Sequence, residues 1–183
     1  MAGPVESLTQ QLIHRMSDPS SLVILTAVTS SSFWLFGNLG TELDGILPAT
    51  VTKSERVKKG ISDASALKLW VWMFHRAKKH FGLTAVFSGA SYLVAATLRP
   101  DLRPILYGAS ILSFAVVPYT LAVLMPINKD ILQTASDASK PDAKGPEEGV
   151  VDKLFGEWRK YHAIRMSIGA VAWGLGTAAL LLA

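Results

Sequence analysis

The chain has 183 residues, of which 50% are hydrophobic and only 17% are charged, and its formal net charge is +4. This composition is typical of an integral membrane protein rather than a soluble domain. The chain contains no cysteine, which excludes a disulfide framework, a thiol nucleophile and a thiolate metal site.

The first segment, residues 1–20, is expected to be a polar arm with a short surface helix around residues 8–16. Residues 20–38 carry no charge and predict the first membrane span. Aromatic side chains gather near the end of this span and suit a membrane interface or a pocket wall. Glycines and a proline follow between residues 37 and 48, and we expect them to break or bend the helix.

A second helix is expected to begin after Ser62, which has the hydroxyl group of a helix N-cap. Before it, residues 53–59 form a basic surface segment. The first half of the second helix is amphipathic and aromatic, whereas residues 81–98 are uncharged and long enough to span a bilayer. A polar turn at residues 99–104 ends it.

Residues 105–125 predict the third span, with a kink at Pro118. Residues 133–145 are rich in Ser, Asp, Lys and Ala and are expected to form a mobile loop. Pro146, directly after a glycine, favours the start of a long last helix. Its residues 163–183 contain a single charge and predict the fourth span.

These elements predict an all-α fold. Short polar connections make neighbouring spans antiparallel, so the expected architecture is an up-down four-helix bundle forming one membrane domain over residues 1–183. The second and fourth helices are longer than their spans and should extend into the cytosol.

Lys and Arg are distributed unequally across the predicted membrane: three lie on one side and fifteen on the other. The positive-inside rule places the basic loops, residues 39–68 and 126–157, in the cytosol. The basic excess is therefore a topology signal and does not indicate nucleic-acid binding. We expect a multi-pass protein of the endoplasmic reticulum or another endomembrane.

The main candidate site lies where the fourth helix enters the membrane. Trp158, His162 and Arg165 follow one another at helical spacing and share one face. An ionisable residue inside a span is by default a functional hypothesis. Arg165 also has a simpler interpretation, in which it extends to the lipid headgroups, and His162 has one as a plain interfacial histidine.

Four further residues are expected at a similar depth: Trp70, His75, Asn128 and Lys129. Each has an alternative interpretation as an interface anchor, a solvated side chain, a helix cap or a headgroup contact. No metal-ligand spacing, phosphate loop or nucleophile motif is visible.

The sequence resembles the fungal anthrone-oxygenase-like (noranthrone monooxygenase-like) family of small four-span membrane proteins. The resemblance covers roughly residues 22–180 and depends on short motifs in a shared order. These are Gly45-Ile46-Leu47-Pro48, Leu69-Trp70, Pro126-Ile127-Asn128-Lys129 and Trp158-x-x-x-His162-x-x-Arg165.

The resemblance implies oxidation of a polyketide anthrone to an anthraquinone with molecular oxygen, without a recognised flavin, haem or metal. The expected partners are a small lipophilic aromatic substrate, the bilayer and other biosynthetic enzymes. We assign His162 as the base and Arg165 as the cation for the enolate oxygen, with Asn128 or Lys129 assisting. Trp70 and Trp158 would stack on the substrate, and His75 is the next candidate base.

Two other functions remain compatible with the sequence. One is a non-catalytic membrane scaffold, in which the polar cluster serves only packing and headgroup contact. The other is an enzyme of the same fold that acts on another small lipophilic substrate without oxygen. Oxygen uptake in the presence of an anthrone distinguishes these possibilities.

Overall fold

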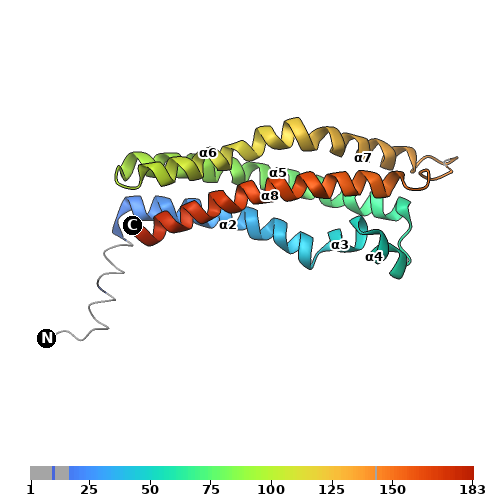
Figure 1. Cartoon of the computed structure of the whole chain (residues 1–183), viewed down its shortest axis with the longest axis horizontal. Coiled ribbons are helices and arrows are strands. Elements are labelled where there is room, and N and C mark those ends of the chain that lie inside the picture. The colour runs from blue at the N-terminus through green and yellow to red at the C-terminus, as the bar shows by residue number, and fades with distance from the viewer. Residues whose placement is uncertain (1–9, 11–16, 143) are drawn as a thin grey trace.

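The computed structural model describes residue 10, residues 17–142 and residues 144–183. The described part is helical and contains no strand. Its elements, in chain order, are α2 (Pro19–Leu43), α3 (Ile46–Val51), α4 (Lys53–Lys58), α5 (Asp63–Leu98), α6 (Arg103–Tyr119), the π-helical η1 (Thr120–Leu124), α7 (Met125–Asp137) and α8 (Val150–Leu182). The long helices run up and down side by side as one elongated bundle (Figure 1). The predicted fold class is therefore confirmed, while the predicted arm at residues 1–20 lies mostly outside the described residues.

Hydroxyl and carboxylate side chains define two helix starts. Asp18 precedes α2 and its Oδ1 accepts a hydrogen bond of 3.1 Å from the Ser20 N–H, with Pro19 at the first helical position. Ser62 precedes α5, and its Oγ accepts a hydrogen bond of 3.2 Å from the Ser65 N–H. The cap predicted at Ser62 is confirmed.

The third long helix is nearly continuous from Arg103 to Asp137, but it changes type in the middle. Pro118 and Pro126 lack the N–H groups that an α-helix requires, and the π-helical η1 lies between them. The N–H of Met125 donates to the carbonyl of Thr120, the i→i+5 bond that defines the wider helix. The irregularity expected at Pro118 therefore takes the form of this π-helical segment, and the chain arches outward between α6 and α7 (Figure 1).

Three predicted boundaries were wrong. The segment expected to be a loop from residue 133 is still helical to Asp137, because α7 continues past the apolar span. The last helix begins at Val150 instead of Pro146, after Gly149 adopts the left-handed φ of 82°. Gly37 and Gly40 were expected to break or bend the first helix, but α2 continues through both glycines to Leu43 because tertiary packing outweighs their weak helix propensity.

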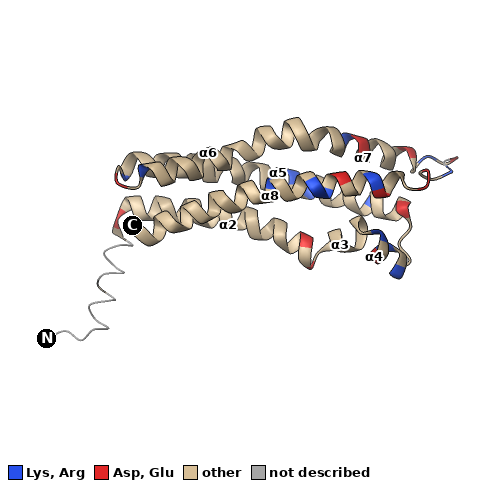
Figure 2. Ribbon diagram, in the orientation of Figure 1, with Lys and Arg blue, Asp and Glu red and all other residues tan. Residues whose placement is uncertain are grey.

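Four helical segments are long and apolar enough to cross a membrane: Pro19–Leu43, Asp63–Leu98, Arg103–Asp137 and Val150–Leu182. Large hydrophobic side chains on their outer faces are exposed, including Phe33, Leu83, Phe87, Ile111 and Val171. Lys and Arg gather at one end of the bundle, which carries α3, α4 and the connection from α7 to α8 (Figure 2). We call it the basic end. The chain is a multi-pass membrane protein, as predicted.

Small residues allow close helix contact in the half of the bundle away from the basic end. A Cβ added at Gly169 of α8 would collide with the Trp34 ring of α2. One added at Gly176 would collide with the Tyr92 ring of α5. Membrane helices commonly use glycine in this way, because it lets a large partner side chain approach the backbone.

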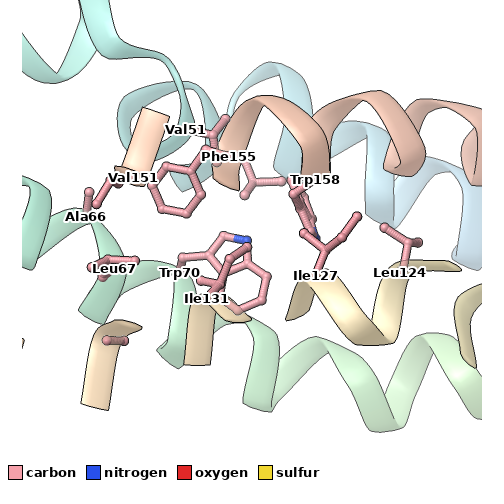
Figure 3. Packing of buried hydrophobic residues seen from close by; sticks show 12 residues of the cluster. Val51, Ala66, Leu67, Trp70, Leu124, Ile127, Ile131, Val151, Phe155 and Trp158 are labelled. Carbon is pink, nitrogen blue, oxygen red and sulfur yellow. The ribbon is translucent and has the colours of Figure 1, made fainter. Parts of the chain in front are cut away.

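The buried core divides into three clusters along the bundle. The cluster at the basic end contains two large aromatic side chains, Trp70 of α5 and Trp158 of α8, together with Phe155 (Figure 3). The middle cluster contains Trp34, Ala85 and Val116 among others. A cavity lies where these two clusters meet.

Candidate functional site

A cavity of about 220 Å³ lies inside the bundle and is lined by residues of α2, α3, α5, α6, η1, α7 and α8. Its walls are mostly apolar and aromatic, and one end carries buried polar side chains. The lining residues that carry the chemistry are Asn38, Asn128, Trp158, His162 and Arg165. An apolar pocket with few convergent polar groups is the usual form of a small-molecule site.

The cavity opens sideways. Among its lining residues, Lys78 and Gly82 of α5 and Leu121 of η1 are exposed. The mouth therefore lies between α5 and η1, where the helix is widened between its two prolines. An opening on the flank of a spanning helix gives access from the bilayer side of the molecule.

Arg165 organises the polar end of the cavity. Its Nη2 donates to Asn38 Oδ1 at 3.1 Å and lies 2.8 Å from His162 Nδ1. Asn38 in turn donates from Nδ2 to the Trp34 carbonyl at 2.7 Å. The guanidinium also lies over the Trp34 ring, 5.8 Å from its centroid. These contacts hold the cation between α2 and α8, where an arginine at membrane depth needs partners.

His162 is fully enclosed and has a defined orientation. It is 3% exposed, and its ring stacks on Trp158 with centroids 4.5 Å apart. Its Nε2 lies 3.3 Å from Glu42 Oε1, although the two atoms are not aligned as a hydrogen bond. The imidazole thus lies between the guanidinium of Arg165 and the carboxylate of Glu42.

Several buried polar atoms at this end have no hydrogen-bond partner among the described residues. They include Asn128 Oδ1, His162 Nε2 and Arg165 Nε. Buried polar groups in folded proteins are nearly always hydrogen-bonded, so each such group calls for a specific explanation. An acceptor on Asn128 and a donor on Arg165 around one cavity are complementary to a ligand that carries both a hydroxyl group and a second oxygen.

The structure brings together four of the predicted site residues and separates three. Asn128, Trp158, His162 and Arg165 all line the cavity. Trp70 is fully buried behind Trp158, with their rings edge to face at 5.9 Å, and does not line the cavity.

The other two lie farther away. Lys129 is exposed on α7 and does not line the cavity. His75 lines a separate, shallower groove between α5 and α7. The roles assigned to all seven residues stay predictions.

Sequence reasoning missed Asn38 and Glu42 as members of the site. They lie one helical turn apart near the end of α2, and the signal was present in the sequence as two polar residues with i,i+4 spacing at the end of an apolar span. Gly37 and Gly40, which flank Asn38, suggested a helix break, so this face of the helix was not assigned to the site.

Among the described residues, no group of three or more His, Asp or Glu side chains is placed to hold a metal ion. The polar side chains that line the cavity are instead those of Arg165 and His162, two asparagines, two threonines and, at the mouth, Lys78. This donor set suits hydrogen bonding to oxygen atoms of an organic ligand.

The fold and the cavity define a multi-pass α-helical membrane protein with a mostly apolar internal cavity. The profile of the anthrone oxygenase family matches residues 70–175 of the chain. The chain belongs to the anthrone oxygenase family, and the resemblance seen in the sequence is confirmed. No curated protein and no solved structure shows significant similarity to it.

Proposed function

We propose that this protein is a membrane oxygenase that converts a lipophilic polyketide anthrone, or a similar carbon acid, into a quinone with molecular oxygen. The observation that carries the proposal is the cavity itself. It joins apolar and aromatic walls to a part-buried Arg165–His162 pair, within a family whose name describes this chemistry.

The reaction needs little from the protein beyond binding, deprotonation and charge stabilisation. Loss of a proton from the methylene carbon of an anthrone gives an electron-rich enolate. The enolate transfers one electron to dioxygen, and the resulting radical and superoxide combine to form a carbon–oxygen bond. The peroxide takes up a proton, the second methylene proton leaves, the O–O bond breaks, and water and the quinone carbonyl result. One oxygen atom of O₂ ends in the quinone and the other in water.

The cavity residues divide these tasks. His162 is the proposed base, because an imidazole titrates near neutral pH and can both accept and return a proton. Arg165 is the proposed partner of the enolate oxygen, and a fixed cation in an apolar site stabilises developing negative charge strongly. Asn128 Oδ1 lacks a partner and is available to a substrate hydroxyl.

The position of the mouth fits a poorly soluble substrate. An anthrone would partition into the bilayer and enter between α5 and η1, past Lys78 and Leu121. Phe74 and Trp158 supply aromatic wall surface. An endomembrane location and contact with other biosynthetic enzymes belong to this proposal, as does the absence of a bound cofactor.

The test is oxygen labelling with purified protein in lipid vesicles. With ¹⁸O₂, the proposal predicts an anthrone-dependent oxygen uptake, one labelled atom in the quinone and one in water. Vesicles without protein give the rate of autoxidation. The His162→Gln protein gives the rate of oxygen uptake when the cavity is present but lacks the proposed base. Uptake no faster than in these controls would favour a scaffold or an enzyme that does not use oxygen. Metal analysis of the active preparation tests cofactor independence separately.

A further inference from the structure

Glu42 is a carboxylate that the catalytic scheme above does not use. It lies at the end of α2, is 23% exposed, and places Oε1 3.3 Å from His162 Nε2. It does not line the cavity, so it stands behind His162 as seen from the substrate.

The hydrogen bond between Arg165 and Nδ1 of His162 fixes the tautomer of the histidine ring. A guanidinium carries donors only, so in the 2.8 Å contact with Arg165 Nη2 the Nδ1 atom must accept. A neutral ring then carries its single proton on Nε2, directed to the side of Glu42. In this arrangement Nδ1 is occupied by Arg165 and Nε2 is already protonated, so neither nitrogen is free to accept a proton from a substrate.

The geometry of Arg165 shows how the base becomes free. The Nε and Nη2 groups form the edge of a guanidinium that binds oxygen in a bidentate manner. On this edge Nε is buried without a partner, while Nη2 holds His162 and Asn38. An oxygen that takes both donors of the edge competes directly with His162 Nδ1.

We propose that substrate binding itself activates His162. The substrate oxygen takes the Nε–Nη2 edge of Arg165, Nδ1 of His162 is released to accept the proton, and Glu42 holds the Nε2–H and stabilises the imidazolium. This inference rests on the proposed function. In the step, the substrate C–H bond breaks, its electron pair passes into the enolate, and the proton moves to Nδ1 while Glu42 stays ionised. Glu42 is thus a positioning residue, comparable to the carboxylate of a catalytic triad.

The first test reads the tautomer without turnover. Protein labelled with ¹⁵N-histidine in nanodiscs should show His162 protonated on Nε2 and hydrogen-bonded at Nδ1, with its signals assigned by their loss in His162→Gln. Saturation with a hydroxyanthraquinone phenolate, which cannot be oxidised further here, should shift the Nδ1 signal toward that of an unbonded nitrogen. In Arg165→Met the Nδ1 signal should be unbonded from the start. A ring protonated on Nδ1, or no response at saturation, would overturn the proposal.

The second test is kinetic. Glu42→Gln should lower kcat, by no more than the ~10²–10⁴-fold that a general base contributes, with KM nearly unchanged. It should also move the Nε2 signal, and Glu42→Asp should recover part of the rate. Asp44→Asn, two residues along and exposed, is the matched control and should behave like the parent.

The two proposals fail separately. A parent protein that oxidises anthrones while Glu42→Gln keeps its full rate and spectrum would refute the positioning role alone. A parent protein that shows no oxidation, yet shows the phenolate-induced release of Nδ1, would refute the oxygenase and leave the binding-coupled switch in place. If Glu42→Gln does not fold, the spectra of the parent and of Arg165→Met still show whether ligand binding releases Nδ1 of His162.

Discussion

Replacing Arg56 tests how much one buried side chain stabilises the helices at the basic end. Arg56 is only 2% exposed and joins three elements. Its guanidinium donates to the Thr50 carbonyl of α3 at 2.9 Å, to Asp63 Oδ1 of α5 at 3.2 Å, and to Asp152 of α8. Leu47, on the same short helix as Thr50, lines the cavity. Arg56→Met keeps an apolar stem against Phe155 and removes every donor.

The loss in the free energy of unfolding follows from the contact that each partner of Arg56 loses. The Thr50 carbonyl is left buried without a partner, which costs about 1–3 kcal/mol. Asp152 keeps its 2.9 Å contact with Lys53, and this contact raises the pKa of the Lys53 ammonium group. Asp63 is 38% exposed and adds little. Together with about 1 kcal/mol for the ion pairs that Arg56 makes with Asp63 and Asp152, this gives an expected loss of about 2–4 kcal/mol, toward the low end of the ~3–5 kcal/mol found when a fully buried ion pair is broken.

Thermal unfolding in detergent, followed by circular dichroism, measures this loss. A fall in Tm of roughly 5–15 °C is expected. The matched control is Lys58→Met, because Lys58 also makes an ion pair, with Glu55 at 2.9 Å, but its side chain is 70% exposed. The double variant Arg56→Met, Asp152→Met should lose less than the sum of the single variants. Equal Tm values for Arg56→Met and Lys58→Met would refute the reasoning.

Three further predictions address the site and the topology. His162→Gln should lower turnover by ~10²–10⁴-fold and still bind an anionic quinone-like inhibitor, whereas Arg165→Met should lose that binding, as measured by tryptophan quenching; equal affinities would remove Arg165 from the oxyanion role. Gly169→Ala should lower stability by about 1–3 kcal/mol through displacement of Trp34, while Gly174→Ala, with open space around it, should be nearly neutral in the same melt. Accessibility tags near Ala138 and at the C-terminus should report opposite sides of the membrane, and the same side for both would refute the four-span topology.

The number and order of the spans could be predicted because they depend on composition alone. Uncharged runs such as residues 81–98 need no tertiary information, and Ser62 marks a helix start by local hydrogen bonding. The ends of α2 and α7 could not be predicted in the same way. Both helices continue past weak local signals because neighbouring helices cover them, and that packing is a property of the assembled bundle.

The candidate site was predictable only on one helix. Trp158, His162 and Arg165 share a face of α8 and could be grouped by periodicity. Asn38 and Glu42 reach the same site from α2, and no sequence periodicity connects α2 with α8. Asn128 and Lys129 are neighbours in sequence, but the helix turns Asn128 inward and leaves Lys129 outside. Which of two adjacent polar residues faces a cavity depends on helix phase, and the phase here is set after the π-helical η1.

The location of the site also explains why a few polar residues would suffice to bind and ionise the proposed substrate. A cation within the bilayer's depth is costly, and Arg165 offsets that cost with Asn38 and His162 while its Nε stays unbonded. A charge is screened less between apolar walls than in bulk water, so an enolate oxygen beside the guanidinium would be stabilised more strongly there than in solution. The same arrangement disfavours a ligand without an oxygen acceptor, which cannot displace His162 from Nη2. Substrate selection, charge stabilisation and release of the base would then depend on one event, the transfer of an Arg165 hydrogen bond from a nitrogen to an oxygen.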